Sequence, residues 1–270
     1  MSFQQIKDRA GQKPVILVEG ASDVFVLSYF FNQMGAGWDA GVLVKAAGDK
    51  NRVQKWVKRA SNWVGIVDKD AWSVEKTIKL AQDSPQLHIL PRFCVENYFC
   101  IPSELWDALP VIQKQGKNYE DFEQRILRKL PDWVAHGALW RVIQKRRSIL
   151  IYDSAFPSAL DASPVTDIDK IRAILHTWHA KLDPDQIIQE YQYELEKAEQ
   201  YSEDALLKTY VHGKKFFNTV VVNDVLNDLF GQKSANEWQQ LLANTNGLAL
   251  PTDLEPFLQD VLDDVRSLSQ

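Results

Sequence analysis

Acidic residues follow two apolar runs of the chain at the points where those runs end. Glu19 closes the run VILVE, and Asp23 comes four residues later. Asp68 and Asp70 follow the run WVGIV and are separated by a single residue. In extended backbone that spacing returns both aspartates to the same side. Because crowded carboxylates repel one another and a divalent cation relieves the repulsion, the four residues predict a site for Mg2+ or Mn2+.

The runs that carry these residues belong to an alternating pattern of strands and helices. Four runs rich in β-branched residues or leucine are predicted to be strands buried on both faces: 14–19, 41–46, 63–68 and 87–91. Three segments between them have apolar residues at helical spacing and a capping residue at the start: 22–35, 49–61 and 73–83. The alternation predicts an α/β fold with a mainly parallel four-stranded sheet flanked by helices. Since ligands bind at the carboxyl ends of parallel strands, we expect the four carboxylates at one edge of the sheet.

The pattern changes to helices from about residue 103. Helical spacing of apolar residues is found in four segments: 119–130, 165–182, 184–201 and 236–245. We therefore divide the chain into an α/β core, residues 1–102, and a mostly helical region, residues 103–270. Because no repeat or low-complexity linker separates the two parts, the helical region is expected to pack on the sheet.

The composition is that of an ordinary soluble protein. The chain has 270 residues, of which 45% are apolar, so it can bury a substantial core. It has no run near the roughly 20 apolar residues of a membrane span, and its first residues lack the apolar core of a signal peptide. A cytoplasmic location without membrane contact is therefore expected. Cys94 and Cys100 are too few for a disulfide framework and are interpreted as small buried hydrophobic residues.

Basic residues gather in two segments, although the net charge of the chain is −5. The first cluster consists of Lys50, Arg52, Lys55, Lys58 and Arg59. The second consists of Arg125, Arg128, Lys129, Arg141, Lys145, Arg146 and Arg147. Such clusters are commonly solvated helix faces, but two of them in a chain with a carboxylate site favour a groove for a phosphate backbone. We predict that the first cluster binds nucleic acid.

The acidic motifs also resemble those of a known family. VEGASD, followed after about fifty residues by IVDKDAW, resembles the TOPRIM domain of topoisomerases, primases and overcoming-lysogenization-defect (OLD) nucleases. Three further segments resemble the OLD branch: KAAGDKNRV at 45–53, CVENYFC at 94–100 and VHGKKFF at 211–217. The set is similar to the small TOPRIM effectors of the PARIS anti-phage system, in which an ABC-type ATPase holds the effector. The resemblance covers residues 14–100 and returns at residues 211–217.

The resemblance implies roles for individual residues. It implies that the four carboxylates at the strand ends bind the metal ion and that Glu96 joins or orients them. It also implies that Lys214 stabilises negative charge on a phosphate, so that residues 211–217 return to the active site. The expected catalytic residues are Glu19, Asp68 and Lys214.

Three of these interpretations have alternatives. Glu96 could instead cap a helix or a turn. Lys215 could take the place of Lys214, or both could be solvated surface lysines. Trp72 follows the Asp-x-Asp motif closely and could either stack on a base or pack against the protein.

These features predict a divalent-metal-dependent nuclease that acts on DNA or RNA. The resemblance implies a toxic effector of anti-phage defence under the control of a partner ATPase. Since a free nuclease would endanger its host, control by assembly or by homodimer formation is favoured. One alternative is a regulatory or docking module whose carboxylates bind metal structurally. Another is a phosphotransferase or phosphatase that uses Asp68 as a nucleophile, whereas a topoisomerase would need a longer chain.

Overall fold

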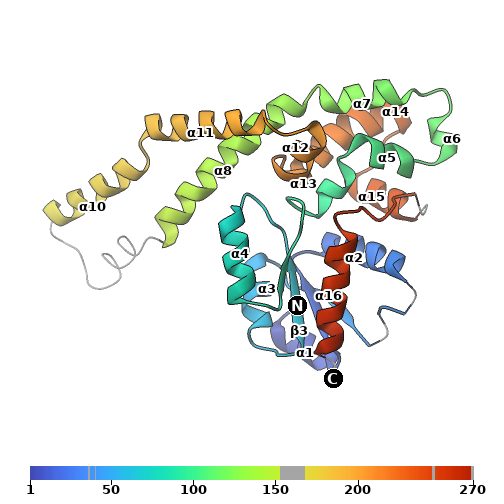
Figure 1. The fold of residues 1–270 in the computed structure, drawn as a ribbon, viewed down its shortest axis with the longest axis horizontal. Helices are drawn as coiled ribbons and strands as arrows, with labels where there is room; N and C mark the ends of the chain where they lie inside the picture. The colour runs from blue at the N-terminus through green and yellow to red at the C-terminus, as the bar shows by residue number, and fades with distance from the viewer. Residues whose placement is uncertain (36, 40, 153–167, 245–246, 269–270) are drawn as a thin grey trace.

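A four-stranded parallel sheet forms the centre of the N-terminal part of the molecule (Figure 1). The computed structural model describes residues 1–35, 37–39, 41–152, 168–244 and 247–268. The strands are β1 (Val15–Val18), β2 (Leu43–Ala46), β3 (Trp63–Val67) and β4 (Leu87–Ile89). They lie in the order β2-β1-β3-β4, and each pairing is parallel. The predicted α/β fold with a parallel sheet is confirmed.

Helices cover both faces of this sheet. The helices of the N-terminal part are α1 (Phe3–Ala10), α2 (Ala21–Met34), α3 (Lys50–Val57) and α4 (Val74–Asp83). Because side chains alternate along a strand, Val15 and Leu17 of β1 pack in one apolar cluster with α1 and α3. Ile16 and Val18 point to the other face and pack in a second cluster with α2. The three helices predicted between the strands are confirmed as α2, α3 and α4.

The outer strands are less buried than the sequence predicts. Every residue of β1 and β3 is buried, as expected for strands that are covered on both faces. All residues of β2 are only half-buried, and so are His88 and Ile89 of β4. The prediction of burial on both faces is wrong for these two strands. Each has a neighbouring strand on one side only, and its other edge is open.

Beyond β4 the described chain is helical. Its elements are the 3-10 helix η1 (Val95–Phe99), α5 (Pro102–Ala108), α6 (Val111–Lys114), α7 (Tyr119–Leu127), α8 (Leu130–Tyr152), α10 (Ile168–Lys181), α11 (Pro184–Ala198), α12 (Glu203–Thr209), α13 (Gly213–Phe216), the π-helix η2 (Phe217–Leu226), α14 (Asn227–Phe230), α15 (Ala235–Asn244) and α16 (Glu255–Ser267). The helices predicted at 119–130 and 184–201 are confirmed as α7 and α11. Those predicted at 165–182 and 236–245 correspond to α10 and α15, but residues 165–167 and 245 lie outside the described residues.

One apolar core joins the helical region to the sheet. Ile16 of β1 and Phe30 of α2 belong to the same buried cluster as Phe216 of α13. The last helix, α16, returns to pack against β3 and α2 and buries Leu258 and Val261 (Figure 1). The core therefore continues across residue 102, and the helical region packs directly on the sheet.

Three helices form an arm that extends from the rest of the molecule. Helices α8 and α11 pack against each other, and α10 lies at the far end of the arm from the sheet (Figure 1). Several apolar side chains of α10 and α11 are exposed, among them Ile168, Ile188 and Tyr193. In the described part of the chain, no helix combines the length and the apolar character that crossing a membrane requires.

A buried arginine ties three segments of the chain together. Arg92 follows β4 and is 1% exposed. Its guanidinium donates hydrogen bonds to both oxygens of Glu104 in α5, at 2.8 and 2.9 Å. It also donates to both oxygens of Asp253, just before α16, at 2.9 Å each. Because both pairs are bidentate, they fix the chain ahead of η1 to α5 and to the start of α16.

Candidate active site

The loops that follow β1 and β3 meet at a small pocket on the carboxyl side of the sheet. From β1 the chain passes to β2 on one side and then to β3 on the other, so β1 and β3 border the crevice in which α/β proteins bind ligands. The pocket has a volume of about 220 Å3. All the predicted metal-binding and catalytic residues line it: Glu19, Asp23, Asp68, Asp70, Glu96 and Lys214.

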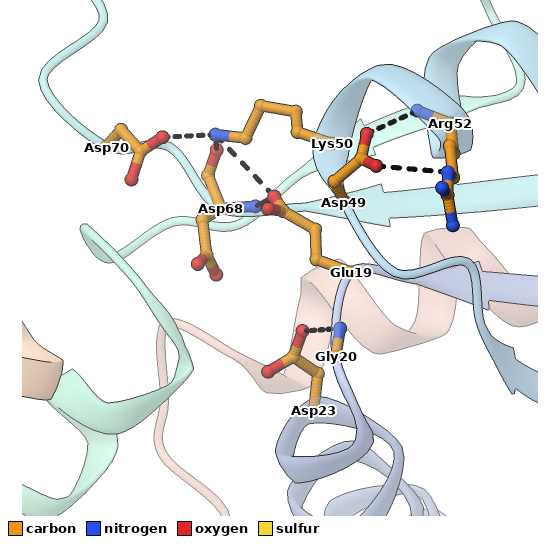
Figure 2. A network of polar contacts seen from close by, with 8 residues as sticks. All are labelled: Glu19, Gly20, Asp23, Asp49, Lys50, Arg52, Asp68 and Asp70. Carbon is orange, nitrogen blue, oxygen red and sulfur yellow. Dashed lines mark hydrogen bonds and ion pairs between the residues drawn. The ribbon is translucent and has the colours of Figure 1, made fainter.

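Glu19 stands one residue beyond β1 and joins the end of that strand to the end of β3. Its Oε1 accepts a hydrogen bond from the backbone N–H of Asp68 at 2.9 Å (Figure 2). Burial raises the pKa of Glu19, and nearby Lys50 and the Asp68 N–H oppose that rise without cancelling it. Glu19 is therefore held between two strands and takes up a proton more readily than an exposed glutamate.

Asp23 lies in the first turn of α2 and caps that helix. Its Oδ2 accepts a hydrogen bond from the backbone N–H of Gly20 at 2.7 Å (Figure 2). Its Oδ1 accepts one from the hydroxyl of Ser22 at 3.1 Å. These bonds fix the carboxylate beside the pocket, and its two oxygens have further lone pairs with which to bind a ligand.

Lys50 lies among the carboxylates and contacts two of them. Its Nζ donates hydrogen bonds to Asp70 Oδ2 and to the backbone carbonyl of Asp68, both at 2.5 Å. The same Nζ lies 3.6 Å from Glu19 Oε1. Figure 2 shows that the carboxylate of Asp68 points away from this ammonium group, toward the side of Asp23. The positive charge of Lys50 therefore lies next to the carboxylates of Glu19 and Asp70, whereas the carboxylate of Asp68 makes no contact with it.

The backbone turns sharply within the Asp-x-Asp motif. Asp70 has a φ of 50°, a left-handed conformation that aspartate tolerates better than most residues. Its N–H donates a hydrogen bond to the carbonyl of Phe93 at 2.8 Å, which holds the turn in place. The sequence analysis predicted that extended backbone would return the two aspartates to the same side, and that prediction is wrong. Both residues line the pocket, but they reach it through a turn and take different partners.

Glu96 lies in the first turn of η1 and is 5% exposed. At the start of η1 the side chain of Asn97 accepts the hydrogen bond from the N–H of Cys94, and Glu96 also lies in that first turn, so its alternative role as a cap stays open. Burial raises the pKa of Glu96, against the effects of a hydrogen bond with Cys94 and of the nearby Lys214. Glu96 is therefore a buried acid that faces the pocket.

Residues 211–217 return to the pocket because Asn97 holds them there. The Asn97 side-chain amide donates hydrogen bonds to the carbonyls of Leu207 and Val211, at 2.6 and 3.0 Å. Gly213 packs so closely that a Cβ atom there would lie 2.1 Å from Asn97 Oδ1. This close approach brings Lys214, whose side chain is exposed, to the pocket.

The acids of the pocket affect one another's protonation. Burial raises the pKa of Asp68 well above its ordinary value, and the negative charges of Glu19, Asp23 and Glu96 raise it further. Within the described residues, no group of three or more His, Cys, Asp or Glu side chains is arranged to hold a metal ion as it stands. The chemistry of the donors still suits a divalent cation, because several hard oxygen ligands share one pocket without enough positive charge to balance them.

The first basic cluster does not form one continuous surface. Arg52 pairs with Asp49, its Nε lying 3.2 Å from Asp49 Oδ2, and turns away from the carboxylates (Figure 2). The guanidinium of Arg59 stacks over the ring of Phe3 at 4.2 Å. Lys55 and Lys58 are exposed, and neither lines the pocket. Nucleic-acid binding by these residues stays a prediction, and Lys50 differs from the others because it contacts Glu19 and Asp70.

The second basic cluster is partly neutralised by acidic partners. Arg125 pairs with both Asp121 and Asp228, at 2.9 and 2.6 Å, and Arg146 pairs with Glu190. The side chain of Arg147 lies outside the described residues. No role was predicted for Cys94 or His212, although both line the pocket. Cys94 belongs to the matched segment CVENYFC and His212 to VHGKKFF, and this membership is the signal that could have identified them.

Comparisons with known protein families and with curated proteins identify no related protein. A scan against models of known protein families finds no match, and a search of curated proteins finds no similar sequence. The resemblance to TOPRIM domains therefore rests on the motifs and on the pocket that they form.

Proposed function

We propose that this protein is a divalent-metal-dependent nuclease that hydrolyses phosphodiester bonds in DNA or RNA. One observation carries the proposal: acids from three separate segments of the chain share one pocket with a lysine from a fourth, and the pKa of Asp68 is raised well above its ordinary value. Without a bound cation, the negative charges of such a pocket outnumber its positive charges. Buried acids of this kind are typical of sites that bind metal and phosphate together.

The residues around the pocket divide between two tasks. Glu19, Asp23, Asp68 and Glu96 would hold a Mg2+ or Mn2+ ion, with Asp70 joining them when it leaves Lys50. A bound ion of this type neutralises charge on the scissile phosphate and lowers the pKa of an attacking water. A pocket of about 220 Å3 has room for an ion with some of its waters, each of which occupies about 30 Å3.

The protein's own groups supply the proton transfer and the remaining charge stabilisation. The raised pKa of Glu19 suits it to accept a proton from the attacking water if it does not bind the ion itself. Lys214, on the segment that returns from the helical region, is placed to stabilise negative charge that develops on the phosphate. Lys50 keeps Glu19 and Asp70 oriented by binding both.

The test is a gel assay of DNA and RNA substrates with purified protein and Mg2+ or Mn2+. Glu19→Gln, Asp68→Asn and Lys214→Ala should each abolish or greatly reduce cleavage. Lys215→Ala is the matched control, because Lys215 is an exposed neighbour that lies over the Trp140 ring and does not line the pocket. The proposal fails if the native chain leaves every substrate intact with either metal and with a partner ATPase present. It also fails if Asp68→Asn, shown to be folded, cleaves as fast as the native chain.

The biological setting is proposed from the motif resemblance. In that setting the nuclease is a toxic effector of anti-phage defence that a partner ATPase holds, and release or dimer formation activates it. A second candidate function is a docking module without cleavage, which the exposed apolar side chains on the arm favour. Metal binding without cleavage in the assembled complex would identify that second function.

A further inference from the structure

A second, larger cavity adjoins the pocket. It is a groove of about 820 Å3, and Asp70 lines both cavities. One wall is the segment 69–76, which runs from the Asp-x-Asp motif into α4. The other wall is formed by α8, α11 and the end of α12, where the arm joins the rest of the molecule (Figure 1).

If the protein cleaves a polymer at the small pocket, the bound strand needs a surface beyond the pocket along which to continue. At about 220 Å3 it lies below the range of about 300 to 1,000 Å3 that sites for small-molecule ligands usually span, whereas the groove lies within that range. A nucleic-acid strand whose phosphate enters the pocket must therefore continue outside it. Because Asp70 lines both cavities, the groove lies next to the pocket and offers that path.

Three basic side chains of the groove, Lys69, Lys76 and Arg141, form no ion pair with an acid in the described part of the chain. Lys69 lines the groove and not the pocket, although it stands between Asp68 and Asp70 in the sequence. Arg141 is fixed by a hydrogen bond to the carbonyl of Thr209 and by stacking over the Tyr210 ring at 4.3 Å. Within the described residues, no ion pair joins Lys69, Lys76 or Arg141 to a carboxylate.

Most acids of the groove already have basic partners. Glu190 accepts from Lys145 at 3.3 Å and also pairs with Arg146. Glu194 lies 4.0 Å from Lys197, and Asp70 binds Lys50. The unpaired charge along this wall is therefore mainly positive.

The groove also offers aromatic surface. Tyr201 is 45% exposed and lines it. The ring of Trp72 lines it too, with Lys50 at 4.1 Å and Lys76 at 4.7 Å from the ring centre. Cations along a groove combined with an exposed aromatic ring are the means by which proteins bind single-stranded nucleic acids, since unpaired bases stack on the ring.

We infer that this groove binds a single-stranded segment of the substrate through its phosphates and one stacked base, with Lys69, Lys76, Arg141 and Tyr201 as the contacts. The inference rests on the proposed nuclease function and names its substrate class. None of the residues predicted to bind nucleic acid in the first basic cluster lines this groove, although Lys50 contacts Asp70 and Trp72, which do.

The test measures binding without cleavage in the Asp68→Asn background, by fluorescence anisotropy of labelled oligonucleotides. Three ligands are titrated, each at several salt concentrations: single-stranded DNA, single-stranded RNA and duplex DNA. The double variant Lys69→Ala/Lys76→Ala should weaken single-strand binding about tenfold. It should also reduce the salt slope by about 1.4, which is about 0.7 for each lost phosphate contact. Tyr201→Ala should weaken single-strand binding roughly tenfold and leave duplex binding unchanged.

Lys55→Ala/Lys58→Ala is the matched control, because it removes the same charge from exposed positions of α3 and its end. The inference is overturned if this control weakens binding as much as the groove variant does. It is also overturned if the groove variant, shown to be folded by its thermal melt, binds like the Asp68→Asn parent. If the native chain cleaves nucleic acid and either of these results is obtained, the inference about the groove is overturned and the nuclease proposal stands. Binding through the groove without any cleavage would support the groove and overturn the nuclease proposal.

Discussion

Replacement of Lys50 with methionine tests how the acids of the pocket are held together. The side chain of Lys50 is 16% exposed, and its ammonium lies 2.5 Å from Asp70 Oδ2 and 3.6 Å from Glu19 Oε1. Methionine keeps much of the length of the apolar stem and removes the charge. Lys50→Met should therefore leave Glu19 and Asp70 without their cation in a partly buried site.

The size of the loss follows from the exposure of the partners. Removal of one member of a buried ion pair costs about 3 to 5 kcal/mol, whereas an exposed pair contributes about 0.2 to 1 kcal/mol. The side chain of Glu19 is 21% exposed and that of Asp70 is 44% exposed, so this site lies between those limits. We expect Lys50→Met to lower the free energy of unfolding by about 2 kcal/mol in EDTA. For a chain of this size that loss lowers the Tm by about 4 to 8 °C.

The assay is urea denaturation of both proteins in EDTA and again in excess Mg2+. In Mg2+ the loss should fall below about 1 kcal/mol, because a bound cation replaces the missing positive charge. Lys55→Met is the control, since Lys55 is exposed on the same helix and makes no ion pair within the described residues. Equal losses for Lys50→Met and Lys55→Met would refute the electrostatic reasoning. A loss for Lys50→Met that Mg2+ leaves unchanged would refute the replacement of the lysine by a metal ion.

Two other substitutions probe the site and its support. Because burial and neighbouring acids raise the pKa of Asp68 in the folded protein, its ionisation costs stability as the pH rises from about 4 through the raised value. Asp68→Asn should therefore match the native stability near pH 4 and exceed it increasingly toward pH 8 in EDTA; equal melting curves at pH 8 would contradict this. Arg92→Met should lower the free energy of unfolding by about 3 kcal/mol, because it leaves the partly buried carboxylates of Glu104 and Asp253 unpaired. A loss below about 1 kcal/mol in urea denaturation would show that the two bidentate pairs contribute little.

The strand ends could be predicted from the sequence because their signals are local. Short apolar runs with helical segments between them predict a parallel sheet, and the carboxyl ends of such strands must meet at one edge. Glu19 and Asp68 therefore lie where that rule places them. The half-burial of β2 could not be predicted in this way, because a run of apolar residues does not show which strand will lie at the edge.

Other features depend on contacts between distant segments. The left-handed turn at Asp70 is held by the carbonyl of Phe93, which follows a later strand. Lys50 looked like one member of a basic cluster, because a count of charges does not show the direction in which a side chain points. The helices of the arm were predicted as helices, but helical spacing does not show that α8 and α11 would pack on each other. For the same reason, the groove that α8 and α11 border could not be predicted from the sequence.

The return of the chain to the pocket has a consequence for synthesis on the ribosome. The acids at the ends of β1 and β3 are made well before Gly213 and Lys214, which follow much later in the sequence. Helix α16, which packs against β3 and α2, is made later still. Because a nascent chain folds as its segments emerge, the sheet forms with one apolar face uncovered and Lys214 absent. A product that stalls before residue 213 therefore carries the acids of the pocket without Lys214, and the complete pocket forms only after that segment has been made.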